Sequence, residues 1–92
     1  MNEVSISFET LPPEYAGRAY QFDNLIVIDI CKESNILDTF IHECLHIVDP
    51  EMKEELVRVI TQLLYEGMNQ YLRHFWYSKI FGSNKNRYLD TA

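Results

Sequence analysis

The first third of the chain has patterns of apolar and polar positions that predict three short strands. Val4–Phe8 alternates apolar with polar residues, as a half-buried strand does, and Arg18–Phe22 is interpreted as a second strand. Leu25–Ile30 is β-branched and almost wholly apolar, which is typical of a strand covered on both faces. The turn pair Asp23–Asn24 predicts a hairpin between the second and third strands, and the two prolines within 11–17 predict a loop after the first.

From residue 36 the pattern changes to the period of a helix. Asn35 is suited to cap its start, with Asp38 three residues on, and Asp49 must leave the helical conformation because Pro50 follows it. The spacing therefore predicts a helix over Ile36–Val48. At 3.6 residues per turn its apolar positions form one broad arc: Ile36, Leu37, Phe40, Ile41, Cys44, Leu45, Ile47 and Val48.

A second apolar stripe follows at helical spacing. It comprises Leu56, Val57, Ile60, Leu63, Leu64, Met68, Tyr71, Leu72 and Phe75. Asp49 can cap this helix with Pro50 at its first position, and the stripe passes through Gly67 without a change of phase. We expect the helix to continue to about Tyr77, since a glycine costs only about 1 kcal/mol relative to alanine.

These elements predict one α+β domain over residues 1–92. It consists of a small, about three-stranded sheet over 1–31, a first helix over 35–49, a long amphipathic helix over 50–78 and a tail over 82–92.

The polar gap of the first helix carries the motif His42-Glu43-x-x-His46. Residues four apart lie on one face of a helix, so both imidazoles can reach one Zn²⁺ at about 2.0–2.1 Å. Glu43 lies about 100° from His42 and about 60° from His46 around the helix. It can flank the metal without binding it and take a proton from zinc-activated water. Cys44, about 160° from His42, is expected to point into the core.

Two histidines need a third protein ligand to hold a catalytic zinc. The nearby carboxylates are Asp49, Glu51, Glu54 and Glu55, and a tight turn at Asp49–Pro50 would bring Glu54 or Glu55 beside His46. The third histidine, His74, lies far along the chain beside Phe75-Trp76-Tyr77 and is expected on the surface or in packing.

Composition excludes several classes of function. The net charge of −6 argues against a nucleic-acid partner, and no apolar run is long enough to span a membrane. The N-terminal residues do not have the pattern of a signal peptide, and two cysteines make no disulfide framework. We therefore expect a cytoplasmic protein in which Cys31 and Cys44 are buried free thiols.

The segment from Ile28 to about Leu64 resembles the small phage-type metallopeptidases related to the gluzincins. The resemblance rests on H-E-x-x-H, the Asp49-Pro50-Glu51 turn and Glu54-Glu55-Leu56-Val57. It implies that His42, His46 and Glu54 bind zinc and that Glu43 is the general base. It also implies location in the cytoplasm of a bacterial or phage-infected cell. We expect these 92 residues to contain no counterpart of the second subdomain that closes the substrate cleft in larger gluzincins.

The first hypothesis is therefore a zinc metallopeptidase acting on a peptide or protein substrate, in which Tyr20, Tyr65 or Arg18 steadies the oxyanion. The alternative is a non-catalytic zinc-stabilised adaptor that docks a partner through the aromatic end of the second helix. A third hypothesis, a helical interaction protein with an accidental motif, predicts no stoichiometric metal. The oligomeric state does not follow from the sequence.

Overall fold

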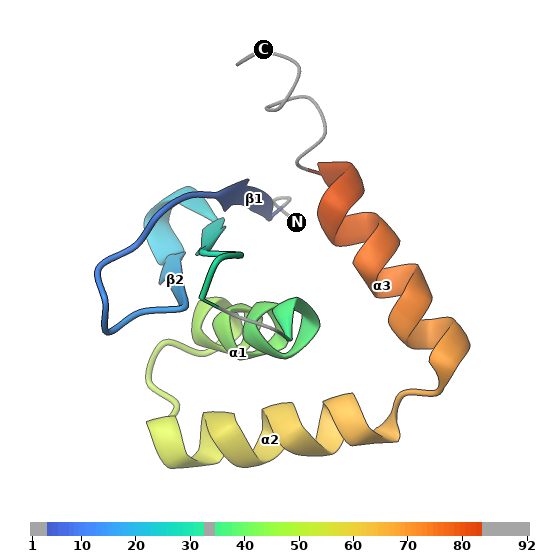
Figure 1. Ribbon diagram of the computed structural model, residues 1–92. Helices are drawn as coiled ribbons and strands as arrows, with labels where there is room; N and C mark the ends of the chain where they lie inside the picture. The colour runs from blue at the N-terminus through green and yellow to red at the C-terminus, as the bar shows by residue number, and fades with distance from the viewer. Residues whose placement is uncertain (1–3, 33–34, 84–92) are drawn as a thin grey trace, which may run out of the picture.

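The computed structural model describes residues 4–32 and 35–83, and within them it shows a three-stranded sheet followed by three α-helices (Figure 1). The α+β fold class predicted from the sequence is therefore confirmed. The strands are β1 (Ser5–Phe8), β2 (Gly17–Tyr20) and β3 (Leu25–Ile28), with a short 3-10 helix at Gln21–Asp23. The helices are α1 (Ile36–Val48), α2 (Glu54–Gly67) and α3 (Gln70–Ser83).

The sheet has the order β1-β3-β2, so β3 is central. It pairs parallel with β1 and antiparallel with β2, which confirms the predicted hairpin. Asn24 makes this turn in the left-handed conformation, with φ of 47°. All three of Ile26, Val27 and Ile28 are buried, as expected for a strand covered on both faces.

Helix α1 has the bounds that its apolar period predicts. The Asn35 side chain accepts a hydrogen bond from the Asp38 N–H at 3.1 Å, so the predicted cap is confirmed. The helix lies between the sheet and α2 (Figure 1), and its apolar face packs into a buried core. This core consists of Ile6, Ile26, Ile28, Leu37, Ile41 and Ile80.

The prediction that α2 begins at Pro50 is wrong. The Asp49 carboxylate accepts a hydrogen bond from the Glu51 N–H at 3.2 Å, and the Asp49 carbonyl accepts one from the Met52 N–H at 3.1 Å. Asp49 thus closes a turn instead of capping a helix, and α2 starts four residues after Pro50, at Glu54.

The prediction of one continuous helix over 50–78 is also wrong. Met68 is extended (φ −81°, ψ 132°), and the Asn69 side chain accepts a hydrogen bond from the Leu72 N–H at 2.8 Å. By accepting this hydrogen bond, Asn69 caps the start of a new helix, and this favours a break over continuation of α2. The helix that follows the break, α3, runs past Gly82 to Ser83. The rest of the predicted tail lies outside the described residues.

Because of the break between α2 and α3, the apolar stripe does not form one continuous buried face. In α2 only Val57 and Thr61 are buried, while Leu56, Leu63 and Leu64 are about half exposed. Helix α3 turns away from α2 and returns to the sheet (Figure 1), where Phe81 meets Phe8 at a ring-centroid distance of 5.4 Å. Ile80 of α3 is thereby buried in the core.

Candidate metal centre

Helix α1 presents its two histidines side by side. Their Nε2 atoms are 3.2 Å apart and the ring centroids 4.9 Å apart. Both side chains are about one-fifth exposed, so the rings are accessible from solvent while the opposite side of α1 is in the core. This is the arrangement that the four-residue spacing predicts.

Glu54, the first residue of α2, faces both imidazoles. Its Oε1 lies 2.7 Å from Nε2 of His42, and its Oε2 lies 3.1 Å from Nε2 of His46. Among the described residues, His42, His46 and Glu54 form the group of three donors able to hold one metal ion. The late start of α2 explains the choice of Glu54, because the turn at Asp49 places the first turn of the helix against α1.

The separations of these donors fit a zinc ion. Two ligands at about 2.05 Å from a tetrahedral centre lie about 3.3 Å from each other. The two imidazole nitrogens are 3.2 Å apart. Glu54 Oε1 lies 2.7 Å from the nitrogen of His42, and Glu54 Oε2 lies 3.1 Å from that of His46. The donor set of two imidazoles and one carboxylate is also one that zinc prefers.

Glu43 lies on the same side of α1 and is 9% exposed. Burial raises the pKa of its carboxyl above the ordinary value of 4.5. The charges of His42 and His46 oppose this rise, and the charge of Glu54 adds to it. The charges of all three donors therefore act on the Glu43 carboxyl, and its burial is the largest cause of the raised pKa.

Cys44 takes no part in this cluster. It packs against the core, and burial, with a smaller effect of the Glu43 charge, raises the pKa of its thiol to about 12. The expectation that Cys44 points into the core is confirmed, whereas Cys31 is exposed and not buried as predicted. His74 is exposed on α3, in agreement with its interpretation as a surface residue.

The three donors open into a hollow of about 620 Å³. Its walls come from the loop before β2, from β2 itself, from α1 and from the start of α2. Besides His42, Glu43, His46 and Glu54 it is lined by Glu14, Tyr15, Ala16, Gly17, Arg18, Ala19, Gln21, Asp38, Thr39 and Arg58. Of the three residues considered for the oxyanion, Arg18 lines the hollow, and Tyr20 and Tyr65 do not.

Two further side chains support the cluster. The Arg58 guanidinium lies one turn beyond Glu54, and its Nε is 3.5 Å from Glu54 Oε1. The Gln21 amide donates a hydrogen bond to the backbone carbonyl of His46 at 3.1 Å, which ties the β2–β3 connection to the end of α1. The four-residue spacing from Glu54 could have identified Arg58, whereas nothing in the local sequence identifies Gln21.

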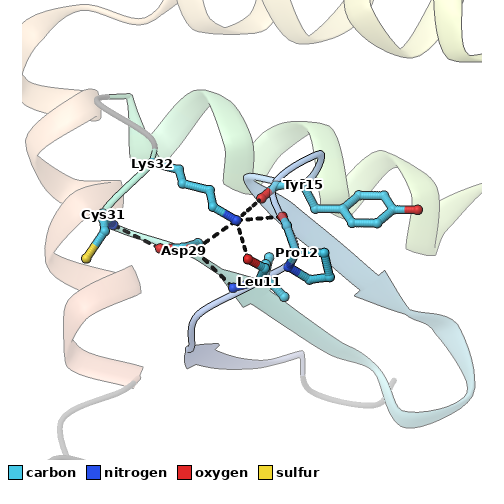
Figure 2. A network of polar contacts seen from close by, with 6 residues as sticks. All are labelled: Leu11, Pro12, Tyr15, Asp29, Cys31 and Lys32. Atoms are coloured by element: carbon cyan, nitrogen blue, oxygen red, sulfur yellow. Dashed lines mark hydrogen bonds and ion pairs between the residues drawn. The ribbon is translucent and has the colours of Figure 1, made fainter.

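The loop that carries Tyr15 is held by a network at the end of β3 (Figure 2). The Asp29 carboxylate accepts hydrogen bonds from the N–H groups of Leu11, at 3.0 Å, and Cys31, at 3.1 Å. The Lys32 ammonium lies 3.3 Å from Asp29 Oδ2 and donates to the carbonyls of Leu11, Pro12 and Tyr15. Sequence reasoning missed Tyr15 as a wall residue because its position depends on this long-range network.

Comparisons of the chain with protein families, with curated proteins and with solved structures find no match. Across residues 4–32 and 35–83, no helix combines the length and the apolar character needed to cross a bilayer.

Proposed function

We propose that this chain is a zinc-dependent metallopeptidase in which His42, His46 and Glu54 bind the metal and Glu43 is the general base. The observation that carries the proposal is the convergence of two imidazole nitrogens and one carboxylate from two helices, at separations of 2.7, 3.1 and 3.2 Å. This donor set is one that zinc prefers. The resemblance of the H-E-x-x-H helix and the E-E-x-V segment to small phage-type peptidases supports it. The cytoplasmic location remains part of the same proposal.

Bound zinc supplies a Lewis acid that polarises a carbonyl and lowers the pKa of water. Glu43 accepts the proton that the attacking water loses and later delivers it to the leaving amine. Its burial favours this exchange, because the protonated and ionised forms become closer in free energy than they are in water. The hollow along β2 gives an extended peptide access to the cluster, and Arg18 and Tyr15 are among the residues that line it.

The test is to replace Glu43 by Gln and to measure zinc content and cleavage of a broad peptide library. We expect stoichiometric zinc in both proteins and a loss of cleavage of about 10²–10⁴-fold in the variant. The matched control is Glu14→Gln, which removes a carboxylate from the same hollow but leaves the three donors and Glu43 in place. Equal cleavage by the parent and Glu43→Gln proteins would contradict the assignment of the base.

A second candidate function, a zinc-stabilised adaptor, is favoured by the exposed apolar side chains of α2 and α3. Tyr71 is 86% exposed, and Leu63, Phe75 and Phe81 are also exposed. The adaptor predicts stoichiometric zinc with no cleavage of any library peptide by the parent protein. An absence of bound zinc would instead favour the accidental motif.

A further inference from the structure

Arg18 lines the hollow and lies beside two tyrosine rings. It projects from β2 and its guanidinium carbon lies 5.0 Å from the ring centroid of Tyr15 and 5.4 Å from that of Tyr20. Both distances are within the range of a cation–π contact. The two tyrosines flank the guanidinium, which is exposed. Within the described residues, no hydrogen bond or ion pair occupies its N–H groups.

No carboxylate in the described part of the chain lies within ion-pair distance of Arg18. The other arginine of the hollow, Arg58, is 3.5 Å from Glu54 and is thus already paired. The acids Glu14 and Asp38 also line the hollow. In a chain with a net charge of −6, Arg18 is a cation that no carboxylate of residues 4–32 and 35–83 neutralises by direct contact.

We infer that Arg18 binds a carboxylate of the peptide that occupies the hollow, and that it thereby selects acidic substrates. This inference rests on the proposed peptidase function. A planar guanidinium with a free edge offers two parallel N–H donors, which match the two oxygens of a carboxylate. The carboxylate can belong to an aspartate or glutamate side chain or to the C-terminus of the peptide. Both sources present the same chemistry.

The role differs from oxyanion stabilisation in a measurable way. An oxyanion donor acts on every peptide bond equally and affects the rate, because the charge that it stabilises develops only during the reaction. A carboxylate receptor acts on binding, and only for peptides that carry the carboxylate. Binding without turnover therefore separates the two roles.

The experiment uses the full chain loaded with zinc and carrying Glu43→Gln, so that peptides bind without being cleaved. Fluorescein-labelled peptides with an amidated C-terminus are compared in pairs that differ by Glu or Gln at one position. A second pair differs only in a free or an amidated C-terminus. We expect about fivefold tighter binding of the acidic member in at least one pair, as for a partly exposed charge pair worth about 1 kcal/mol.

Adding Arg18→Gln should reduce this ratio to about one while zinc content and the binding of neutral peptides persist. The matched control is Lys79→Gln, because Lys79 also lies over an aromatic ring, that of Phe75, but sits on α3 away from the hollow. It should leave the ratio unchanged.

A ratio of one in the starting protein, or a ratio that survives Arg18→Gln, would overturn the role of Arg18 and leave the peptidase proposal standing. A ratio lost equally with Lys79→Gln would show an effect of overall charge and would also overturn it. If the zinc-loaded protein binds neither acidic nor neutral peptides, the proposed function itself fails. The Glu/Gln pairs and the C-terminal pair identify which source the carboxylate has.

Discussion

Gly17 and Thr39 are packed so closely that a Cβ atom on Gly17 would lie 2.6 Å from Cγ2 of Thr39. The same atom would lie 3.2 Å from Cγ of Glu43. Strand β2 can thus approach α1 at the candidate site only because residue 17 has no side chain.

Replacing Gly17 by Ala should therefore force β2 away from α1. We expect the free energy of unfolding to fall by about 1–3 kcal/mol, the cost of overpacking a close contact. Urea unfolding followed by circular dichroism measures this. The control is Gly82→Ala, because a Cβ at Gly82 meets nothing within 4 Å and alanine favours a helix by up to about 1 kcal/mol. Equal stabilities of the Gly17→Ala and parent proteins would contradict the close approach.

The choice of Glu54 among the neighbouring acids can be tested by zinc affinity. Glu54→Ala should weaken zinc binding by more than about 100-fold, since loss of a direct ligand exceeds the effect of changing a residue behind one. Glu55→Ala is the matched control, because Glu55 is the adjacent acid in the first turn of the same helix. A competition titration against a zinc chelator gives both affinities. Similar losses in the two variants would argue against Glu54 as the third ligand.

The network around Asp29 predicts a dependence of stability on pH. The hydrogen bond from the Leu11 N–H is the largest cause that lowers the pKa of the Asp29 carboxyl below its ordinary value of 3.8. Because the folded protein holds this carboxyl ionised, its contribution to stability is complete above the unfolded pKa, about 3.9. It is lost as the pH falls through the lowered folded value.

We therefore expect the parent protein to be more stable than Asp29→Asn at neutral pH and this difference to shrink below about pH 4. Urea unfolding of both proteins across the acidic range measures it. Glu14→Gln, an exposed acid of the same loop, serves as the control and should show no such convergence. A stability difference that grows towards low pH would contradict the assigned direction.

The two cysteines should differ in reactivity. Cys31 is exposed, whereas burial raises the pKa of the Cys44 thiol to about 12. At about pH 8, a thiol-reactive chromogenic disulfide should modify one cysteine quickly. The Cys31→Ser protein should react slowly until urea is added, and Cys44→Ser should keep the fast phase. Fast reaction of the Cys31→Ser protein without denaturant would show that Cys44 is accessible.

The break between α2 and α3 depends on Asn69. Asn69→Ala removes the acceptor for the Leu72 N–H and should lower the free energy of unfolding by about 1 kcal/mol. Gln70→Ala, at the first residue of α3, is the control and should change it by less than about 0.5 kcal/mol. Urea unfolding compares the two. An unchanged stability in Asn69→Ala would mean that this cap does not hold the start of α3.

The sequence predicted α1 and its two histidines well because both depend on local properties. Asn35 caps the first turn, Pro50 prevents extension, and the apolar arc decides which face is buried. The position of His42 and His46 on one face of α1 then follows from the helical period alone.

The predictions for the second helix failed because contacts between residues distant in sequence outweigh the local helical pattern. The stripe stays in phase through Gly67, so periodicity cannot reveal that Asn69 starts a new helix or that Ile80 is needed in the core. Tyr15 lies on a loop that Asp29 and Lys32 hold through contacts spanning 17 to 21 residues. Arg18 is placed by the pairing of β2 with β3.

Helix α1 supplies Leu37 and Ile41 to the core as well as both candidate imidazoles, whereas α2 has only two buried side chains. Unfolding of α1, which would separate the imidazole pair, therefore also exposes core side chains. Detachment of α2 alone would remove Glu54 and leave the pair intact. Release of the proposed metal would then begin at the Glu54 carboxylate, and its rate would report on a local opening of α2 that leaves the sheet folded.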